Sequence, residues 1–87
     1  MKNGKEALIE GIKRRVRVYL TDEDVMDRWT VVIGGDVFTM SDNATAPNGV
    51  NQYMGTAREI DFSRVGTRVD MAEIPYQVLL GIKDRLI

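Results

Sequence analysis

The sequence of 87 residues contains no cysteine and no histidine. Without cysteine the chain can form neither disulfides nor thiolate zinc sites, on which small secreted proteins usually depend. Without histidine it lacks the commonest general base and the commonest side-chain ligand of transition metals. We therefore expect a cytoplasmic, non-enzymatic protein with no catalytic residues, no metal site and no cofactor.

Long apolar runs are also missing. No stretch approaches the roughly 18 consecutive apolar residues that a membrane span requires, and residues 1–11 lack the apolar region of a signal peptide. The apolar fraction of 44% and the charged fraction of 29% are typical of globular proteins. A chain this short supports one core, so we expect a single soluble domain over residues 1–87 and no membrane contact.

Charge is distributed unevenly, although the net charge is only −1. Residues 1–20 carry six basic and two acidic side chains, whereas residues 21–27 carry four acidic and no basic ones. One interpretation is two solvated faces that attract each other. The other is a basic patch for an anionic partner, with Arg14, Arg15 and Arg17 as candidate binding residues.

The N-terminal apolar residues fit two patterns. Leu8, Ile12, Val16 and Leu20 recur every four positions, as on one face of a helix. From Val16 to Leu20 the apolar residues also alternate with polar ones, as in a strand. We predict a helix over residues 5–14 and leave residues 15–20 open between helix and strand. In the domain description, residues 1–20 form a basic, helical N-terminal segment and residues 21–87 form a sheet plus a C-terminal helix.

A β-hairpin is the clearest predicted element. Residues 28–33 and 37–40 are rich in β-branched and aromatic side chains, and Gly34 and Gly35 between them supply the positive φ angles of a tight turn. Residues 58–62 and 67–69 are expected to add a third and a fourth strand.

The C-terminal segment is predicted to be a helix that begins near Ala72. Pro75 is tolerated only in its first turn, and Asp70 with Glu73 could cap it. A stripe at helical spacing should pack on the hairpin, against Trp29 or Thr30, Val31, and Ile33 or Val32: Ile74, Val78, Ile82 and Leu86.

Residues 41–56 are expected to form a long polar loop, because they show neither helical nor strand periodicity. Such a loop is unusual in a small domain unless it has a function. Its side chains can either satisfy their own backbone or bind a polar ligand or partner. The candidate binding residues are Asp42, Asn43, Asn48, Asn51, Gln52 and Tyr53.

Several short strings resemble a group of small bacterial and phage proteins without an assigned activity. The strings are residues 27–33, 40–43, 47–49, 51–53 and 66–69, followed by Ile74-Pro75. The group's pattern is Asp-Arg-aromatic-Thr-Val-Val, Met-Ser, Pro-x-Gly and Gln-aromatic, then Gly-Lys-Arg with Leu-Pro. This sequence departs from it at Thr67 and Ile74, and at Ala44 to Ala46, where the group often has an aromatic residue and a histidine. The resemblance implies a phage or mobile-element context and no mechanism.

The spacing or composition of the sequence argues against three specific functional motifs. An EF-hand counted from Asp22 would need glycine at Asp27 and glutamate at Ile33. Gly34-Gly35-Asp36 joins two strands and lacks the lysine of a phosphate loop. Nucleic-acid binding by Lys13 to Arg17 is not expected, because no recognised motif accompanies these residues and the chain as a whole is acidic.

The sequence thus predicts an α+β fold: an N-terminal helix, a hairpin extended to an antiparallel sheet of three or four strands, and a C-terminal helix packed on that sheet. We expect a protein of phage or mobile-element origin that binds and modulates a host protein. Two alternatives stay open. One is a small-ligand or nucleotide sequestering protein in which Arg14, Arg15 or Arg58 pairs with phosphate. The other is a structural subunit of a homo-oligomer, for example a homodimer.

Overall fold

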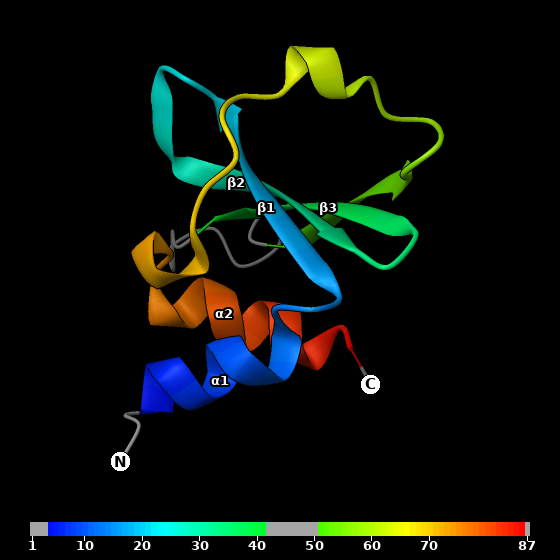
Figure 1. Ribbon diagram of the computed structural model, residues 1–87. Helices are drawn as coiled ribbons and strands as arrows, with labels where there is room; N and C mark the ends of the chain where they lie inside the picture. Colours follow the sequence, from blue (N-terminus) through cyan, green and yellow to red (C-terminus); the bar gives the residue numbers. More distant parts are fainter. Residues whose placement is uncertain (1–3, 42–50, 87) are drawn as a thin grey trace.

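A computed structural model describes residues 4–41 and 51–86, which form one four-stranded antiparallel sheet and two helices (Figure 1). The strands follow one another in the order β1-β2-β3-β4. This arrangement confirms the predicted α+β class. The elements are α1 (Gly4–Ile12), β1 (Val16–Asp22), β2 (Val25–Ile33), β3 (Asp36–Ser41), β4 (Asn51–Thr56) and α2 (Tyr76–Asp84), with short 3₁₀ turns at Phe62–Arg64 and Met71–Glu73.

Residues 16–20 form a strand, which decides between the two patterns that the sequence allowed. The helix ends at Ile12, where the Arg15 N–H donates to the Ile12 carbonyl. Val16 and Val18 are buried while Arg17 is exposed, and Val18 pairs with Val31 of β2. Describing residues 1–20 as one helical segment is therefore wrong beyond Ile12, because these β-branched residues gain a paired strand on β2.

The predicted hairpin is confirmed, with one refinement at its turn. Ile33 pairs with Asp36, so Gly34 and Gly35 alone connect β2 to β3. Gly34 has a φ of 61°, whereas Gly35 is not among the residues with positive φ. A positive φ only at the first central position is typical of a type II′ turn, which matches the twist of the flanking strands.

The segment between β3 and α2 differs from the prediction. Residues 51–56, expected as the end of a loop, form β4 and pair with β3. Residues 58–62, expected as a strand, form a turn and the start of the 3₁₀ turn Phe62–Arg64, in which Asp61 accepts hydrogen bonds from the Ser63 N–H (3.1 Å) and hydroxyl (2.6 Å). Pairing with β3 outweighs the weak intrinsic pattern of residues 51–56, whereas the side chain of Asp61 favours a local turn.

The C-terminal helix begins later than expected but buries the predicted stripe. Residues 71–73 form a 3₁₀ turn, with the Asp70 carboxylate accepting from the Ala72 N–H at 2.9 Å, and α2 starts after Pro75. Ile74, Val78 and Ile82 are fully buried, and Leu86 is partly buried. Each fully buried aliphatic side chain contributes about 1.5–3 kcal/mol to folding.

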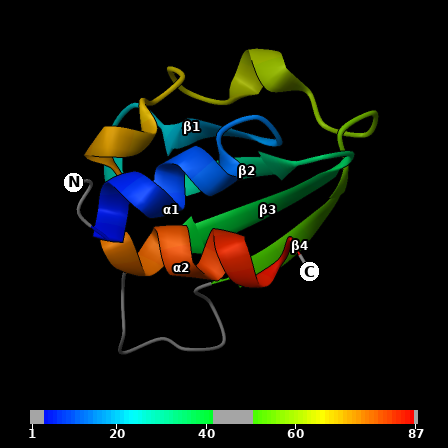
Figure 2. The same cartoon turned by 60° about the horizontal axis from the view of Figure 1, so that its bottom comes forward.

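Both helices cover the same face of the sheet (Figure 2). The core cluster joins them to Val16 and Val18 of β1 and to Trp29, Val31 and Ile33 of β2, which settles the parity of β2. The alternate residues Thr30 and Val32 are also buried, on the opposite face, which residues 57–70 cross (Figure 1). No helix within residues 4–41 and 51–86 is long and apolar enough to cross a membrane.

Candidate functional site

One edge of the sheet, along β1, is closed by residues 66–69. The Gly66 N–H donates to the Leu20 carbonyl (2.7 Å), the Leu20 N–H to the Thr67 carbonyl (3.0 Å) and the Val69 N–H to the Val18 carbonyl (2.8 Å). Tyr19 and Arg68 form an antiparallel bridge. The strand predicted at residues 67–69 is thus present only as this bridge, and it satisfies backbone groups that an edge strand otherwise exposes.

Two further features fix residues 66–69 on β1. The Glu23 carboxylate, in the turn between β1 and β2, accepts hydrogen bonds from both the N–H and the hydroxyl of Thr67. Gly66 lies so close to β1 that an added Cβ would be 2.9 Å from the Leu20 Cβ and 3.0 Å from the Leu20 carbonyl oxygen. Only glycine allows this approach, and the acidic turn at residues 22–24 has an anchoring role that its charge alone did not indicate.

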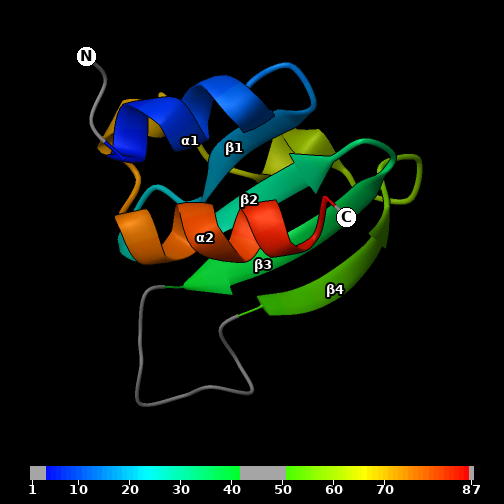
Figure 3. The ribbon, with the colours of Figure 1, turned by 90° about the horizontal axis from the view of Figure 1, so that it is seen from below.

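The opposite edge, formed by β4, is open within the described part of the chain (Figure 3). No described residue bonds to the outer side of residues 51–54. The strand contains no charged residue and no proline, which natural edge strands commonly use against unwanted pairing. Tyr53 is 55% exposed and Met54 is 50% exposed, so this edge presents apolar side chains to solvent.

A bulge shapes the far end of β4. The register shifts between Val37 and Phe38, which pair with Gly55 and Tyr53, so Met54 is the extra residue. Gly55 adopts a φ of 131°, which side chains other than hydrogen rarely allow. Beyond it the Glu59 carboxylate accepts from the N–H (3.1 Å) and the hydroxyl (2.8 Å) of Thr56. The regularly paired part of the open edge is therefore residues 51–53, and Met54 lies at the bulge that ends it.

Two carboxylates lie beside this edge. Tyr53 packs edge-on against Phe38, and its hydroxyl donates to Asp36 at 3.3 Å. Partial shielding from water and the neighbouring Asp36 carboxylate raise the pKa of the Tyr53 phenol. The hydrogen bonds from the Thr56 hydroxyl and N–H lower the pKa of Glu59. The phenol is thus neutral and Glu59 is charged at neutral pH, so two carboxylates lie near Tyr53, while the Arg85 guanidinium lies 5.2 Å from the centre of the neighbouring Phe38 ring.

The structure separates the candidate residues predicted from the sequence. Gln52 and Tyr53 lie on β4, and Asn51 is described through its backbone alone. Asp42, Asn43 and Asn48 lie outside the described residues. Arg14, Arg15 and Arg17 lie at the start of β1, at the other edge of the sheet. Among the described residues, Gln52 and Tyr53 therefore do not form one site with the three arginines.

Basic side chains converge where α1 leads into β1, and we call this group the basic corner: Lys13, Arg14, Arg15, Arg17 and Arg68. They line a hollow of about 500 Å³ together with Val16, Val32 and Gly34. Arg68 comes from the segment that closes the β1 edge. Sequence reasoning missed Arg68, because it lies about 50 positions from the other four and reaches them only through that pairing. Arg58, the other arginine offered to phosphate, does not line this hollow.

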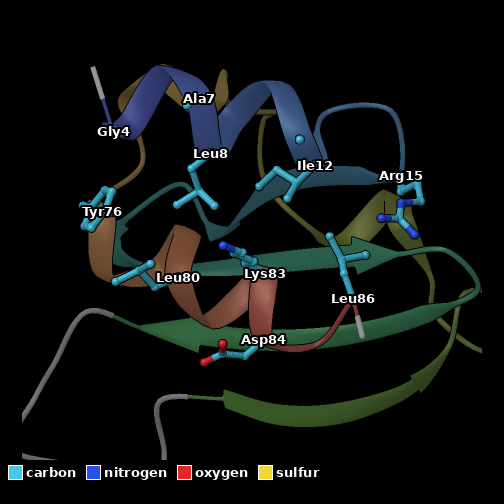
Figure 4. A pocket seen from close by; sticks show the side chains of 11 residues that line it. Gly4, Ala7, Leu8, Ile12, Arg15, Tyr76, Leu80, Lys83, Asp84 and Leu86 are labelled. Atoms are coloured by element: carbon cyan, nitrogen blue, oxygen red, sulfur yellow. The ribbon is translucent and has the colours of Figure 1, made fainter. Parts of the chain in front are cut away.

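A shallow groove of about 510 Å³ also runs between α1 and α2 (Figure 4). Small residues of α1, among them Gly4, Ala7 and Gly11, face Tyr76 and Leu80 of α2 across it. Among its charged side chains, Arg15 lies at one end, whereas Lys83 lies between Leu80 and Leu86 (Figure 4). The groove is the seam between two helices that pack on the sheet.

Within residues 4–41 and 51–86, no three acidic side chains gather as metal ligands would, including those of the acidic turn. Comparison with protein-family models, with curated proteins and with solved structures found no match to this chain. The resemblance to the bacterial and phage group therefore stays a prediction, and function has to be inferred from the open edge and the basic corner.

Proposed function

We propose that this protein is a non-enzymatic binding module that takes up an extended segment of a partner protein along the outer edge of β4 and thereby modulates that partner. The observation that carries the proposal is the uncharged edge of residues 51–54, which no other described residue pairs with on its outer side and on which Tyr53 and Met54 are about half exposed. A peptide that adds to a sheet as a new strand gains affinity from backbone hydrogen bonds to the edge strand. Every second side chain of the peptide lies on the same face of the sheet, and the contacts of these side chains give specificity.

The difference between the two edges supports this proposal. The β1 edge is closed by three backbone hydrogen bonds from and to residues 66–69 and by the Glu23 carboxylate. In this fold a loop therefore covers one edge of the sheet. The β4 edge has a bulge at Met54 and a bond to Glu59 at its far end, which limit pairing to a short stretch. Because only a short stretch of β4 can pair, and the bulge restricts its register, this edge is better suited to binding one peptide segment than to open-ended association of strands.

The charged and aromatic side chains beside β4 indicate which kind of peptide segment can bind there. Asp36 and Glu59 flank Tyr53, so an acidic segment is repelled and a neutral or basic one is favoured. Tyrosine is a common anchor in protein interfaces, because it adds large contact area with few rotatable bonds. We expect the partner to supply an extended segment with apolar side chains and a net positive charge.

Selection from a random peptide display library tests this proposal, because it samples extended segments of every composition. Peptides enriched on the wild-type protein should bind Tyr76→Lys unchanged and lose binding to Tyr53→Lys and Met54→Lys. Tyr76 is a matched control, because it is also an exposed tyrosine, 45% exposed, but lies on α2. Bound peptide should slow amide hydrogen exchange at residues 51–54.

Two results would contradict the proposal. Peptides whose binding survives both β4 substitutions, or that protect amides elsewhere, would assign binding to another surface. A concentration-dependent dimer in sedimentation that Tyr53→Lys dissociates would assign the β4 edge to a second copy of the chain.

A further inference from the structure

We infer that the basic corner is a binding site for a short phosphate chain, a ligand of two or three linked phosphate groups. Five cationic residues line one hollow, and Lys13, Arg17 and Arg68 also line an adjoining hollow of about 460 Å³. Volumes of this size lie within the range of small-ligand sites. This inference concerns the edge of the sheet opposite β4 and does not depend on the proposed function.

The charges of the basic corner are not neutralised by the described part of the protein. None of the five residues forms an ion pair with a carboxylate of residues 4–41 or 51–86, whereas Arg64, elsewhere on the surface, pairs with Asp61 at 3.6 Å. Asp70 lines the adjoining hollow and keeps its charge while it accepts from the Ala72 N–H, but no carboxylate lines the hollow that all five cations share. Bringing five like charges together is unfavourable, and a bound polyanion relieves this repulsion.

Part of the basic corner is held in place before any ligand arrives. The Arg17 Nη1 donates to the Tyr19 hydroxyl at 3.3 Å, and its guanidinium lies 5.8 Å from the centre of the Phe62 ring. Only one of the five guanidinium N–H groups is used in this way, which leaves donors for phosphate oxygens. Arginine forks bind phosphate through paired hydrogen bonds, and a fixed fork loses less entropy on binding.

A purely structural explanation covers only part of the cluster. Cations just after a helix stabilise the negative end of its dipole, and this explains Lys13 and Arg14 after Ile12. It does not explain Arg17, which lies within β1, or Arg68, which the bridge to Tyr19 brings alongside β1. These two residues serve as the diagnostic pair in the experiment below.

The charge of the remaining surface favours a compact anion over a long one. Five of the twelve lysines and arginines belong to the basic corner, which leaves seven against thirteen carboxylates over the rest of the chain. A nucleic acid or an acidic polypeptide that extends beyond the basic corner meets this acidic remainder and is repelled. A short phosphate chain places its charge within the hollow.

Isothermal titration with sodium tripolyphosphate tests the inference, with ATP, inorganic phosphate, polyglutamate and duplex DNA as parallel ligands. The Arg17→Gln/Arg68→Gln variant should weaken tripolyphosphate binding about tenfold or more. The matched control Arg28→Gln/Arg64→Gln removes the same charge but should retain wild-type affinity, because Arg28 lies four residues along β2 from the Val32 that lines the hollow and Arg64 is paired with Asp61. Equal affinity for ATP and tripolyphosphate identifies the phosphate chain as the recognised group, and tighter ATP binding adds a nucleoside contact.

A second variant keeps the test decisive if Arg68→Gln disturbs residues 66–69. Arg14→Gln/Arg15→Gln removes two exposed charges that contact neither Phe62 nor Tyr19, and it should also weaken tripolyphosphate binding. Equal weakening in the Arg28/Arg64 control, no titration heat with tripolyphosphate, or tighter binding of polyglutamate or DNA than of tripolyphosphate would overturn the inference.

Discussion

The two edges of this sheet are treated in opposite ways. The β1 edge is covered by residues 66–69, anchored by Glu23 and brought close by Gly66, whereas no residue of 4–41 or 51–86 pairs with the outer side of residues 51–54 in β4. An unpaired edge exposes backbone donors and acceptors that invite another strand. A chain that closes one edge with such specific contacts while leaving the other uncharged has its pairing capacity concentrated at β4. The following predictions test this contrast, beginning with the largest expected effect.

Gly66→Ala should open the β1 edge. The added Cβ would lie 2.9 Å from the Leu20 Cβ and 3.0 Å from its carbonyl oxygen, so backbone has to move. We expect a loss of about 1–3 kcal/mol in the free energy of unfolding, measured by urea denaturation. Gly11→Ala is the control, because a Cβ there meets nothing within 4 Å and alanine's helix propensity should keep or raise stability in α1. An unchanged midpoint for Gly66→Ala would show that residues 66–69 do not close this edge.

Gly55→Ala should disturb the bulge that ends the open stretch of β4. A φ of 131° is strained for any residue with a side chain, and we expect a destabilisation of about 1–2 kcal/mol. Gly35→Ala, in open space without a positive φ, should change stability by less than about 0.5 kcal/mol. Thermal unfolding of both variants measures the difference. Equal melting temperatures for the two variants would contradict the view that the bulge at Met54 limits pairing along β4.

Glu23→Ala should loosen the closed edge locally. It removes the acceptor of two hydrogen bonds from Thr67 and should cost about 1 kcal/mol. Amide exchange at Gly66, Leu20 and Val69 should accelerate, while β2 and β3 keep their protection. Asp24→Ala, in the same turn, is the control. If both variants behave alike, the carboxylate of Glu23 is not the anchor.

The smallest effect concerns pH at the open edge. The pKa of Glu59 is lowered by its bonds from Thr56, so its stabilising contribution is complete above the ordinary glutamate pKa of about 4.3 and is lost as the pH falls through the lowered value. Exchange of the Thr56 amide, corrected for intrinsic rates, should therefore lose protection in acid. Glu59→Gln should abolish this pH dependence. A wild-type profile that persists in Glu59→Gln would assign it to another group.

The sequence predicts secondary structure and burial most accurately where the local residue pattern and the tertiary packing favour the same conformation. The stripe at Ile74, Val78 and Ile82 is buried as its spacing indicates, and the Gly34 turn joins two strands with strong β-branched character. The sequence also left the correct option open at residues 16–20. There, helical and strand spacing coincide, and only the pairing of Val18 with Val31 decides between them.

The functional surfaces depend on pairing that local pattern does not contain. Asn51, Gln52 and Gly55 carry little strand propensity, so β4 is recognised only through its register with β3. Arg68 joins the basic corner because the backbone of Val69 bonds to Val18. In both cases residues distant in sequence make the site, which is why composition and spacing alone suggested one loop and one basic segment instead.

The packing of α1 beside α2 also has a consequence for the order of folding. The four strands are consecutive neighbours, so their contacts close over short stretches of chain, whereas the core residues Ile12 and Ile82 come from helices separated by the whole sheet. Short-range contacts form sooner than long-range ones. During synthesis α1 and the strands are complete before α2, so the core residues Trp29, Val31 and Met40 lack their α2 neighbours until α2 has been made. A nascent chain that stops before Tyr76 therefore leaves these residues partly uncovered, and it is the species that we expect to depend on chaperones.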